Sequence, residues 1–364
     1  MRVLAWPAPS QLHTNPVTAL IYSAFASEGI AIEPYSAWTM REPNADVFHV
    51  HWPEAILWGR AANHTPFMAK LAAHHALRTM DVVRRKGGTV VWTVHNIAPH
   101  AFTTQQHERV WAQFFPKFRR KVDALIGLTG RSLDLVADTY PELRDRPRAV
   151  VPHPHYRTSY PAPPTIAEAR TAIGVPEDHF VTAMIGIMRR SKGIPRAIDA
   201  FRKARQRKET LYVGGACPDA GLAAEIRNAI GDDTSVIFDD QPLPDADLVA
   251  RFAAADAILI NQASTLNSGT LLLALSMDRP TIAPARGSVV ELADTVGDGW
   301  IATFPDELGP ETLRMCLDTL QGRQRGVRAP LDRYDPATVS RATIAALQDA
   351  LARRRAARNI HVAV

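Results

Sequence analysis

The amino-acid sequence predicts an α/β protein built from two doubly wound domains that face each other across a cleft. Apolar, β-branched strands alternate with amphipathic helices along the chain, which is the pattern of parallel sheets covered by helices on both faces. The chain has 364 residues, more than a single hydrophobic core usually serves. A Pro-rich stretch at 152–165 separates two alternating series, and we interpret it as an interdomain linker.

The first alternating series predicts an N-terminal domain at 1–151. Runs of apolar and β-branched residues predict its strands, and apolar residues at helical spacing predict its helices. The expected strands are 2–6, 45–51, 89–95 and 124–128. The expected helices are 17–28, 69–85 and 106–122.

The second series predicts a C-terminal domain at 166–335. Its expected strands are 180–187, 210–213, 235–238 and 257–261, and its expected helices are 195–205, 220–229 and 244–254. A small polar loop, an apolar helix and a short strand then follow within 267–284. The Ala- and Arg-rich tail at 336–364 predicts a last helix, which we expect to pack back on the N-terminal domain.

The composition argues against three classes of protein: nucleic-acid-binding, disulfide-rich and membrane-spanning. The chain has 42 Lys and Arg against 37 Asp and Glu, a formal charge of +5, and the cations are scattered. That excess does not predict a nucleic-acid partner. Two distant cysteines provide neither a disulfide framework nor a metal spacing, as expected in a reducing compartment. No secretory signal and no bilayer-spanning apolar run is recognisable, so we expect a cytoplasmic protein.

Polar side chains follow the predicted strands of the first domain. Ligands of doubly wound sheets bind outside the carboxyl ends of the strands, so these residues are candidates for chemistry. Glu54 follows the strand that carries His51, and a carboxylate in this position is a candidate general base. His95 ends the next strand and is a second candidate base. The structural alternative for Glu54 is a helix-capping role.

Three further side chains of the first domain are candidates for binding sugar hydroxyl groups. Asn96 and His100 belong to the loop that follows His95, where amide and imidazole groups offer donors and acceptors. Asn15 follows the first strand, although capping of the next helix is the stronger expectation for it.

The second domain carries the features expected of a phosphate site. Gly186 lets the backbone approach a ligand closely, while Arg189 and Lys192 supply positive charge beside a helix start. The loop is neither a Walker A loop nor a dinucleotide fingerprint. Further along, small polar residues precede the apolar helix and expose its free N–H groups to a diphosphate. They are Asn267, Ser268, Gly269 and Thr270.

Aromatic and basic residues interleave over 109–121, from Arg109 to Lys121. One interpretation is a surface that contacts an anionic membrane. The alternative is an aromatic stripe that faces the core with a solvated basic edge, which we favour for Trp111 and Phe115.

With these residues in view, the chain resembles the GT-B glycosyltransferases, and more closely the xanthan-type GDP-mannose:glycolipid β-1,4-mannosyltransferases. Three segments carry the resemblance: 49–54 (His-Val-His-Trp-Pro-Glu), 93–100 (Thr-Val-His-Asn-Ile-Ala-Pro-His) and 267–276 (Asn-Ser-Gly-Thr-Leu-Leu-Leu-Ala-Leu-Ser). It extends from Met1 to about Trp300. The resemblance implies transfer of mannose from GDP-mannose, with inversion, to a lipid-diphosphate-linked oligosaccharide in exopolysaccharide biosynthesis.

The sequence departs from the commoner retaining GT-B pattern, which places two glutamates around the donor loop. Leu273 stands where the second glutamate would be, and Ile187 stands where that pattern has an arginine. An inverting transfer needs one base and positive charge on the leaving diphosphate. We therefore assign Glu54 as base, with His51 or His95 as substitute or helper, and we expect neither a metal ion nor another cofactor.

Alternatives remain at this stage. The chain could be a retaining GT-B enzyme with another nucleotide sugar, a sugar-nucleotide epimerase, or a non-catalytic nucleotide-sugar-binding protein. We expect peripheral attachment to the inner face of the plasma membrane, because the resemblance implies a lipid-linked acceptor. The donor, the acceptor, the linkage and the oligomeric state are not determined by the residues themselves.

Overall fold

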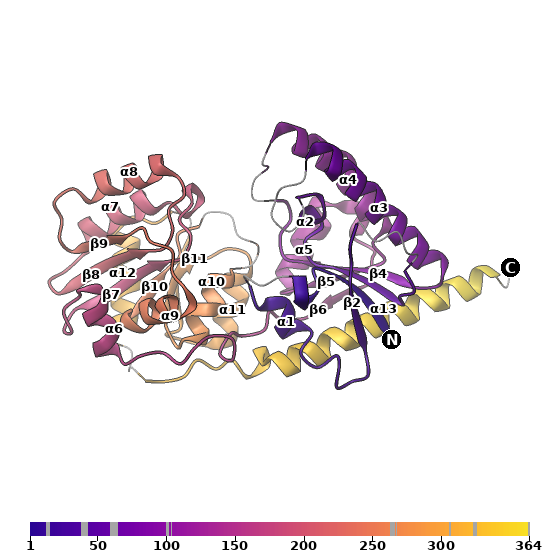
Figure 1. The fold of residues 1–364 in the computed structure, drawn as a ribbon. Coiled ribbons are helices and arrows are strands. Elements are labelled where there is room, and N and C mark those ends of the chain that lie inside the picture. The colour runs from indigo at the N-terminus through magenta and orange to yellow at the C-terminus, as the bar shows by residue number, and fades with distance from the viewer. Residues whose placement is uncertain are drawn as a thin grey trace. The chain divides into compact units, whose positions relative to one another are not determined.

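The computed structural model describes residues 1–11, 15–37, 43–58, 65–99, 102, 104–262, 266, 268–305, 307–322 and 326–362. The chain divides into two units (Figure 1). Unit 1 consists of Met1–Pro154 together with Arg333–Val364, and unit 2 is His155–Asp332. The chain therefore passes between the units twice, once inside the Pro-rich stretch and once before the last helix.

Unit 1 is built on a six-stranded parallel sheet with the order β2-β1-β3-β4-β5-β6. Its strands are β1 (Arg2–Trp6), β2 (Ala31–Pro34), β3 (Val47–Val50), β4 (Thr89–Val94), β5 (Ala124–Gly127) and β6 (Arg148–Val150). The sequence pattern indicated the four inner strands and missed β2 and β6. Both are edge strands whose residues are mostly exposed, so they lack the apolar run that marks a buried parallel strand.

Helices cover both faces of this sheet (Figure 1). Helices α3 and α4 pack together on one face, and α1 packs with α13 on the other. The helices of unit 1 are α1 (Val17–Ile21), α2 (Pro53–Trp58), α3 (Pro66–Arg85), α4 (Gln105–Lys121), α5 (Gly130–Thr139) and α13 (Pro336–Val362). Apolar residues of α13 join the core of unit 1, and Arg355 forms an ion pair with Asp46 at 2.7 Å.

The first helix is shorter than the sequence pattern predicts. A helix over 17–28 was expected, but α1 ends at Ile21 and turns continue to Gly29. The N–H of Ala24 donates to the hydroxyl of Ser340 on α13 at 2.9 Å, and the Ser23 hydroxyl donates to the carbonyl of Pro336. A tertiary contact with α13 therefore replaces the helical hydrogen bond at Ala24, which the local pattern could not reveal.

The aromatic residues of α4 belong to the core. Trp111, Phe114, Phe115 and Phe118 are buried, and Phe115 meets the ring of Trp92 edge-on. At the basic end of the helix, Arg119 pairs with Glu142 and Lys121 pairs with Asp81. The core interpretation of 109–121 is thus correct for its aromatic side chains, while Arg109, Lys117 and Arg120 are exposed.

Unit 2 contains a second six-stranded parallel sheet with the order β12-β11-β10-β7-β8-β9. Renumbered within the unit, this is the Rossmann order, with the topological switch point between β7 and β10. Its strands are β7 (Phe180–Ile185), β8 (Glu209–Gly214), β9 (Val236–Asp239), β10 (Ala257–Leu259), β11 (Thr281–Pro284) and β12 (Ile301–Phe304). Unit 1 has a different order, with its switch point between β1 and β3.

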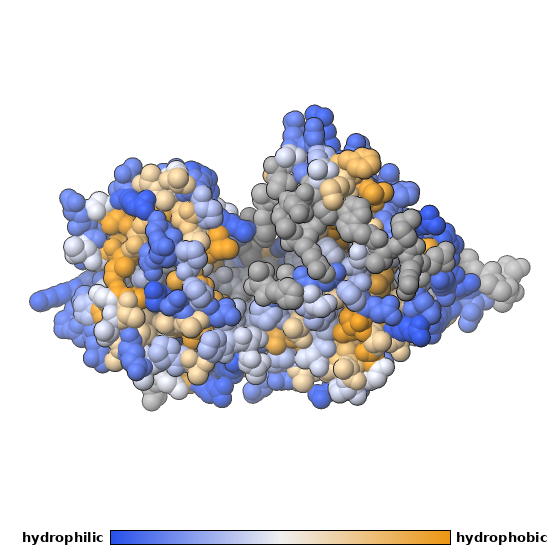
Figure 2. All heavy atoms as spheres, viewed as in Figure 1, coloured by the Kyte–Doolittle hydropathy of each residue, from blue (hydrophilic) through white to orange (hydrophobic). Residues whose placement is uncertain are grey.

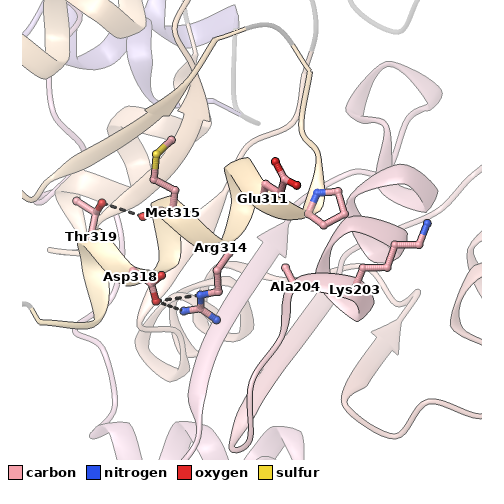
Figure 3. A pocket seen from close by; sticks show the side chains of 8 residues that line it. Lys203, Ala204, Glu311, Arg314, Met315, Asp318 and Thr319 are labelled. Atoms are coloured by element: carbon pink, nitrogen blue, oxygen red, sulfur yellow. Dashed lines mark hydrogen bonds and ion pairs between the residues drawn. The ribbon is translucent and has the colours of Figure 1, made fainter.

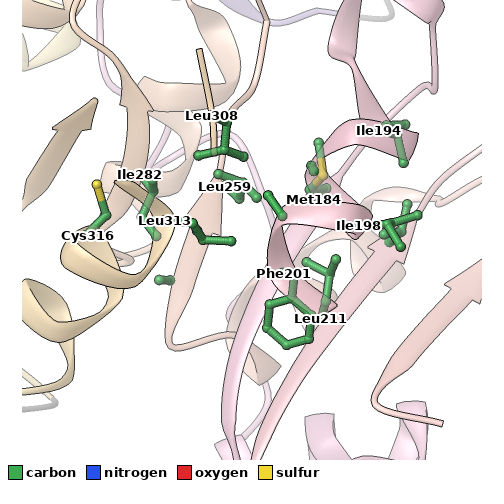
Figure 4. Packing of buried hydrophobic residues seen from close by; sticks show 14 of the residues in the cluster. Met184, Ile194, Ile198, Phe201, Leu211, Leu259, Ile282, Leu308, Leu313 and Cys316 are labelled. Atoms are coloured by element: carbon green, nitrogen blue, oxygen red, sulfur yellow. The ribbon is translucent and has the colours of Figure 1, made fainter. Parts of the chain in front are cut away.

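One large apolar cluster of unit 2 lies between its sheet and α7, α8 and α12, and another includes residues of α9, α10 and α11. Met184 of β7, Phe201 of α7 and Leu313 of α12 meet in the first cluster with other apolar side chains (Figure 4). The helices of unit 2 are α6 (Ile166–Ile173), α7 (Ile194–Ala204), α8 (Ala220–Ile230), α9 (Asp245–Ala254), α10 (Gly269–Ser276), α11 (Ser288–Val296) and α12 (Pro310–Gln321). Within the described part of the chain, no helix has the length and apolar content needed to cross a bilayer.

Candidate active site

In unit 2, the predicted glycine–basic loop lies at the carboxyl end of β7. Gly186 directly follows the strand and has φ +97°, a conformation that favours glycine. The ammonium group of Lys192 folds back over this turn and donates to the carbonyls of Ile185 and Gly186 at 3.2 and 3.3 Å. Burial, assisted by the nearby Arg189, lowers the pKa of Lys192 to about 8, so the side chain is still mainly a cation at pH 7.

The three cations of this loop are in different situations. Arg190 forms ion pairs with Asp219 at 2.8 Å and Glu225 at 2.9 Å. Arg189 is exposed, and no described carboxylate forms an ion pair with it. Lys192 contacts only backbone oxygens among the interactions observed. The choice of Arg189 and Lys192 as phosphate ligands is therefore compatible with the structure, whereas Arg190 is already engaged.

The second predicted donor segment lies across the switch point from this loop. The hydroxyl of Ser268 accepts from the N–H of Leu271 at 3.2 Å and caps α10, so Gly269 and Thr270 form its first turn. N–H groups of a first turn carry partial positive charge and bind anions. Asn267, the remaining residue of the segment, lies outside the described residues.

Two supporting residues of unit 2 escaped the sequence analysis. Asn261 follows β10 and donates to the carbonyl of Gly193 at 3.1 Å, which fixes the end of the basic loop. Gly215 follows β8, and a side chain there would collide with the backbone of Gly186 at 2.7 Å. The sequence shows an Asn and a Gly at these positions. Their contacts join loops that follow different strands, and only the folded structure shows that these strands are adjacent.

In unit 1, Glu54 lies in the first turn of α2, directly after β3. Its side chain is 8% exposed, and burial raises its pKa to about 7, although a hydrogen bond to its own backbone N–H acts in the opposite direction. A carboxylate with a pKa near the working pH has the property expected of a general base. Glu54 lies in the first turn of α2 and its carboxylate bonds its own backbone N–H, so the helix-capping alternative for this side chain stays open beside the role of a base.

The histidines of unit 1 form a buried hydrogen-bonded chain. Nδ1 of His51 lies 3.0 Å from Nε2 of His95, and Nε2 of His51 lies 2.9 Å from the hydroxyl of Tyr22. The same hydroxyl lies 2.7 Å from Nδ1 of His49. The ring of His95 stacks on Trp52 with centroids 4.2 Å apart. Sequence reasoning found the histidines but not Tyr22, which comes from the turns after α1.

Burial sets the charge of this histidine chain. It lowers the pKa of His51 and His95 well below the ordinary histidine value, and neighbouring histidines reinforce the shift. Both rings are therefore neutral at pH 7 and resist protonation. Of the three catalytic candidates, Glu54 is the one whose pKa suits a base near neutral pH.

The three candidate acceptor-binding residues of unit 1 are in different situations. The carboxamide oxygen of Asn15 accepts from the N–H of Val17 at 3.1 Å and forms a turn just before α1, whose N-cap position is Pro16 and not Asn15. Asn96 is half-buried directly after His95 at the carboxyl end of β4. His100 lies outside the described residues.

One pocket lies apart from the predicted site residues, and the described residues hold no cluster of metal ligands. An open pocket of about 650 Å³ lies between the end of α7 and α12 in unit 2 (Figure 3). Arg314 and Asp318 in its wall form an ion pair at 2.7 Å, and none of the predicted site residues lines it. No group of three or more His, Cys, Asp or Glu side chains in the described ranges is arranged to hold a metal ion.

Comparison with known proteins agrees with the resemblance seen in the sequence. The chain is 28% identical over 331 residues to a GDP-mannose:glycolipid 4-beta-D-mannosyltransferase of Xanthomonas campestris pv. campestris, which covers 89% of this chain and 85% of that protein. A second protein of that name, from another strain, is 27% identical over the same length. No family model matches the chain.

Solved structures confirm the fold. HepE of Anabaena, in complex with UDP and glucose, superposes with a TM-score of 0.59 at 15% identity, over 100% of this chain and 99% of that one. Sucrose-phosphate synthase of Thermosynechococcus elongatus gives 0.58 at 15% identity, over 100% and 99%. The expected GT-B architecture of two Rossmann-like domains is thus confirmed, and the sequence similarity to the Xanthomonas proteins supports a glycosyltransferase.

Proposed function

We propose that the protein is an inverting mannosyltransferase. It transfers mannose from GDP-mannose to a lipid-diphosphate-linked oligosaccharide in exopolysaccharide biosynthesis. The observation that carries the transferase assignment is the placement of the Lys192 loop and the first turn of α10 on either side of the switch point of unit 2. The donor and the acceptor class rest on similarity to the Xanthomonas enzyme.

Unit 2 binds the nucleotide sugar in this proposal. Lys192 and Arg189 neutralise the diphosphate, and the N–H groups of Gly269 and Thr270 donate to it together with Ser268 and Asn267. Gly186 and Gly215 pack closely and carry no side chains, so the diphosphate can approach the backbone there. Negative charge grows on the diphosphate as the glycosidic bond breaks, so these contacts strengthen in the transition state.

Unit 1 activates the acceptor. Glu54 accepts the proton of the acceptor hydroxyl while that oxygen attacks the anomeric carbon of mannose. The bond between this carbon and the diphosphate oxygen breaks in the same step, and GDP leaves with the electron pair. His51 and His95 assist as neutral hydrogen-bonding groups, and Asn15, Asn96 and His100 remain the candidates for contacts with acceptor hydroxyls.

Protein groups alone neutralise the charge of the leaving diphosphate in this mechanism, without a metal ion. Transfer that persists in excess EDTA would agree with this assignment. Transfer that is lost in EDTA and restored by one divalent cation would replace it with a metal-assisted mechanism.

We propose further that unit 1 attaches peripherally to the inner leaflet of the plasma membrane, where a lipid-linked acceptor resides. Unit 1 has 23 Lys and Arg against 14 Asp and Glu, a formal +9, whereas unit 2 has 19 against 23, a formal −4. Anionic lipid attracts basic surfaces by about 1 kcal/mol for each Lys or Arg near the membrane. The charge asymmetry therefore favours unit 1 as the membrane-facing part.

The aromatic side chains of α4 are buried and cannot supply the apolar part of this membrane contact. We propose that exposed apolar side chains of α3 supply it. Phe67 is 74% exposed and Leu71 is 45% exposed. They share one side of α3 with the exposed Lys70, His74 and Arg78, and we call these five residues the α3 face. Figure 2 shows apolar side chains reaching the surface among hydrophilic ones over α3 and α4.

The test is a transfer assay with GDP-mannose and a lipid-diphosphate oligosaccharide, with UDP-glucose as the competing donor. We expect a β-mannosylated glycolipid and no product from UDP-glucose. An α-linked product would indicate a retaining enzyme. Transfer from UDP-glucose alone would show that the donor, and with it the pathway, is a different one. Stabilisation by GDP-mannose without turnover would indicate a binding protein.

A further inference from the structure

Three segments of unit 2 meet at the carboxyl end of α10, the helix whose first turn belongs to the proposed donor site. The hydroxyl of Ser276, the last residue of α10, accepts from the N–H of Tyr156 at 2.9 Å. It also donates to the carbonyl of Leu272 one turn earlier, at 2.6 Å. Ser276 and Tyr156 are both buried, so this hydroxyl connects the backbone at Tyr156 directly to the helix.

Asp278 makes a second connection just after α10 ends. Its φ is +55°, a left-handed conformation that is uncommon for residues other than glycine. Its Oδ1 accepts from the guanidinium of Arg157 at 2.6 Å and from the N–H of Ala329 at 2.9 Å. The same guanidinium nitrogen donates to the carbonyl of Ala329 at 2.8 Å, which closes a triangle of hydrogen bonds. We call the residues of these two connections the α10 joint: Tyr156, Arg157, Ser276, Asp278 and Ala329.

The α10 joint contains chain from both passages between the units. Tyr156 and Arg157 follow the first passage closely, since the first part of unit 1 ends at Pro154. Ala329 lies shortly before the second passage, which leads into unit 1 at Arg333. The Arg157 side chain is 15% exposed and Ala329 is buried, so solvent screens the triangle only in part.

Tyr156 also contacts the other end of α10. Its hydroxyl lies 3.7 Å from the position that a Cβ atom on Gly269 would occupy, which is ordinary van der Waals range. Its ring meets the ring of Tyr160 edge-on, with centroids 6.1 Å apart. Tyr156 therefore touches α10 at both ends, through its backbone N–H at Ser276 and through its hydroxyl at the first turn.

Directional contacts matter for α10 because the helix is short and apolar. Its eight residues correspond to a length of about 12 Å, and a helix this short is not stable by itself. Four of its apolar side chains are buried: Leu271, Leu272, Ala274 and Leu275. Apolar burial is non-directional, so it holds the helix in the core without fixing its position along its own axis. Hydrogen bonds have a narrow geometry and can fix that position.

We propose that the α10 joint sets the axial position of α10 and thereby the position of the N–H groups in its first turn. Resting on the proposed function, this makes Tyr156, Arg157 and Asp278 positioning residues for the donor diphosphate, which act through the helix. First-turn N–H groups bind anions. Loss of the joint should therefore weaken binding of the diphosphate and leave binding of the nucleoside unchanged.

The test uses GDP with guanosine and UDP with uridine, because each pair differs only by the diphosphate. Titrations of the full-length protein give the ratio of the nucleoside Kd to the nucleoside diphosphate Kd. Arg157→Gln removes the ion pair and should lower this ratio about tenfold, as expected for one weakened charge-assisted hydrogen bond. Arg202→Gln is the matched control, because Arg202 of α7 pairs with Asp233 at 3.1 Å. An unchanged ratio, or equal losses in the two variants, would overturn the proposal.

A pair of tyrosine variants tests the contact at the first turn. Tyr156→Phe keeps the ring and the backbone N–H but removes the hydroxyl beside Gly269, so the ratio should fall by less than in Arg157→Gln. Tyr160→Phe is the matched control, since Tyr160 packs on the same ring, and it should leave the ratio unchanged. Equal effects of the two variants would contradict the role of the Tyr156 hydroxyl.

Hydrogen exchange without ligand keeps the proposal testable if these variants fold poorly. Asp278→Asn is milder, because asparagine tolerates the left-handed backbone and can still accept from the N–H of Ala329. The N–H of Leu271, which donates to the Ser268 hydroxyl at 3.2 Å, should exchange faster in this variant. The N–H of Leu211 on β8 should keep its rate. Equal acceleration at both sites would show a general loss of stability and contradict the proposal.

The outcomes separate this proposal from the transferase assignment. In the transfer assay, Arg157→Gln should raise the GDP-mannose KM and leave the glycolipid KM unchanged. Binding of UDP and not of GDP would reject the proposed donor, while a lower ratio in Arg157→Gln would still support the α10 joint. Mannose transfer with an unchanged ratio in every variant would reject the joint alone. A wild-type protein that binds neither diphosphate would overturn both.

Discussion

Unit 1 brings buried titratable side chains to the carboxyl ends of its strands, whereas unit 2 brings glycines and cations to the same place. Glu54 and the hydrogen-bonded His51 and His95 of unit 1 are shielded from water, and their pKa values are shifted toward the neutral forms. Lys192 in unit 2 keeps its charge beside a backbone that no side chain covers, and the exposed Arg189 belongs to the same loop. Two sheets of similar construction therefore suit different chemistry. The first favours proton transfer and hydroxyl recognition, and the second favours binding of a diphosphate.

The largest expected effect comes from removing the proposed base of unit 1. Glu54→Gln keeps the shape of the side chain but cannot accept a proton, so kcat should fall by about 10²–10⁴-fold. The Kd for GDP-mannose, measured by calorimetry, should stay nearly the same, because the proposed donor site is in unit 2. Unchanged turnover would reject Glu54 as the base and break the division of roles between the units.

Removing the buried cation of unit 2 should affect binding and turnover together. Lys192→Ala is expected to weaken GDP-mannose binding about tenfold and to lower kcat by about 10²-fold, since the proposed contact with the leaving diphosphate would strengthen in the transition state. Arg190→Ala is the matched control, because Arg190 is engaged by Asp219 and Glu225. Equal losses in the two variants would show that only the overall positive charge of the loop matters.

The pH profile of kcat/KM should have an acid limb set by Glu54 of unit 1 and an alkaline limb set by Lys192 of unit 2. Glu54 has to be deprotonated, so kcat/KM should rise about tenfold per pH unit below a pKa of about 7. Lys192 has to be protonated, so kcat/KM should fall above a pKa of about 8. Rate profiles from pH 5 to 10 check both limbs. Lys192→Arg should remove the alkaline limb only, and a profile without an acid limb would contradict the assignment of Glu54.

The smallest expected effect concerns the membrane surface. Phe67→Ser combined with Leu71→Ser should weaken binding to vesicles that contain anionic lipid about tenfold, because two exposed apolar side chains no longer enter the interface. Met315 of unit 2 is 56% exposed, and Met315→Ser is the matched control with no expected effect. Vesicle sedimentation at two salt concentrations measures both, and equal behaviour of the variants would locate the contact away from the α3 face.

Much of the fold could be read from the sequence because buried parallel strands leave a strong local signal. The runs at Thr89–Val94 and Phe180–Ile185 are apolar and β-branched, and both are buried strands. Edge strands such as β2 and β6 lack this signal, since their side chains are mostly exposed. The end of α1 at Ile21 also escaped prediction, because the competing hydrogen bond comes from Ser340, more than three hundred residues away.

The chemical groups of the site are encoded locally along the chain. A glutamate and histidines follow strands of the first half, and a glycine–basic loop and a capped helix occur in the second. Which of these residues meet depends on the fold: strand order places the Lys192 loop next to β10, and the turns after α1 bring Tyr22 between His49 and His51. Side-chain type and periodicity are local properties, whereas pKa values and hydrogen-bond partners depend on burial and on neighbours distant in sequence.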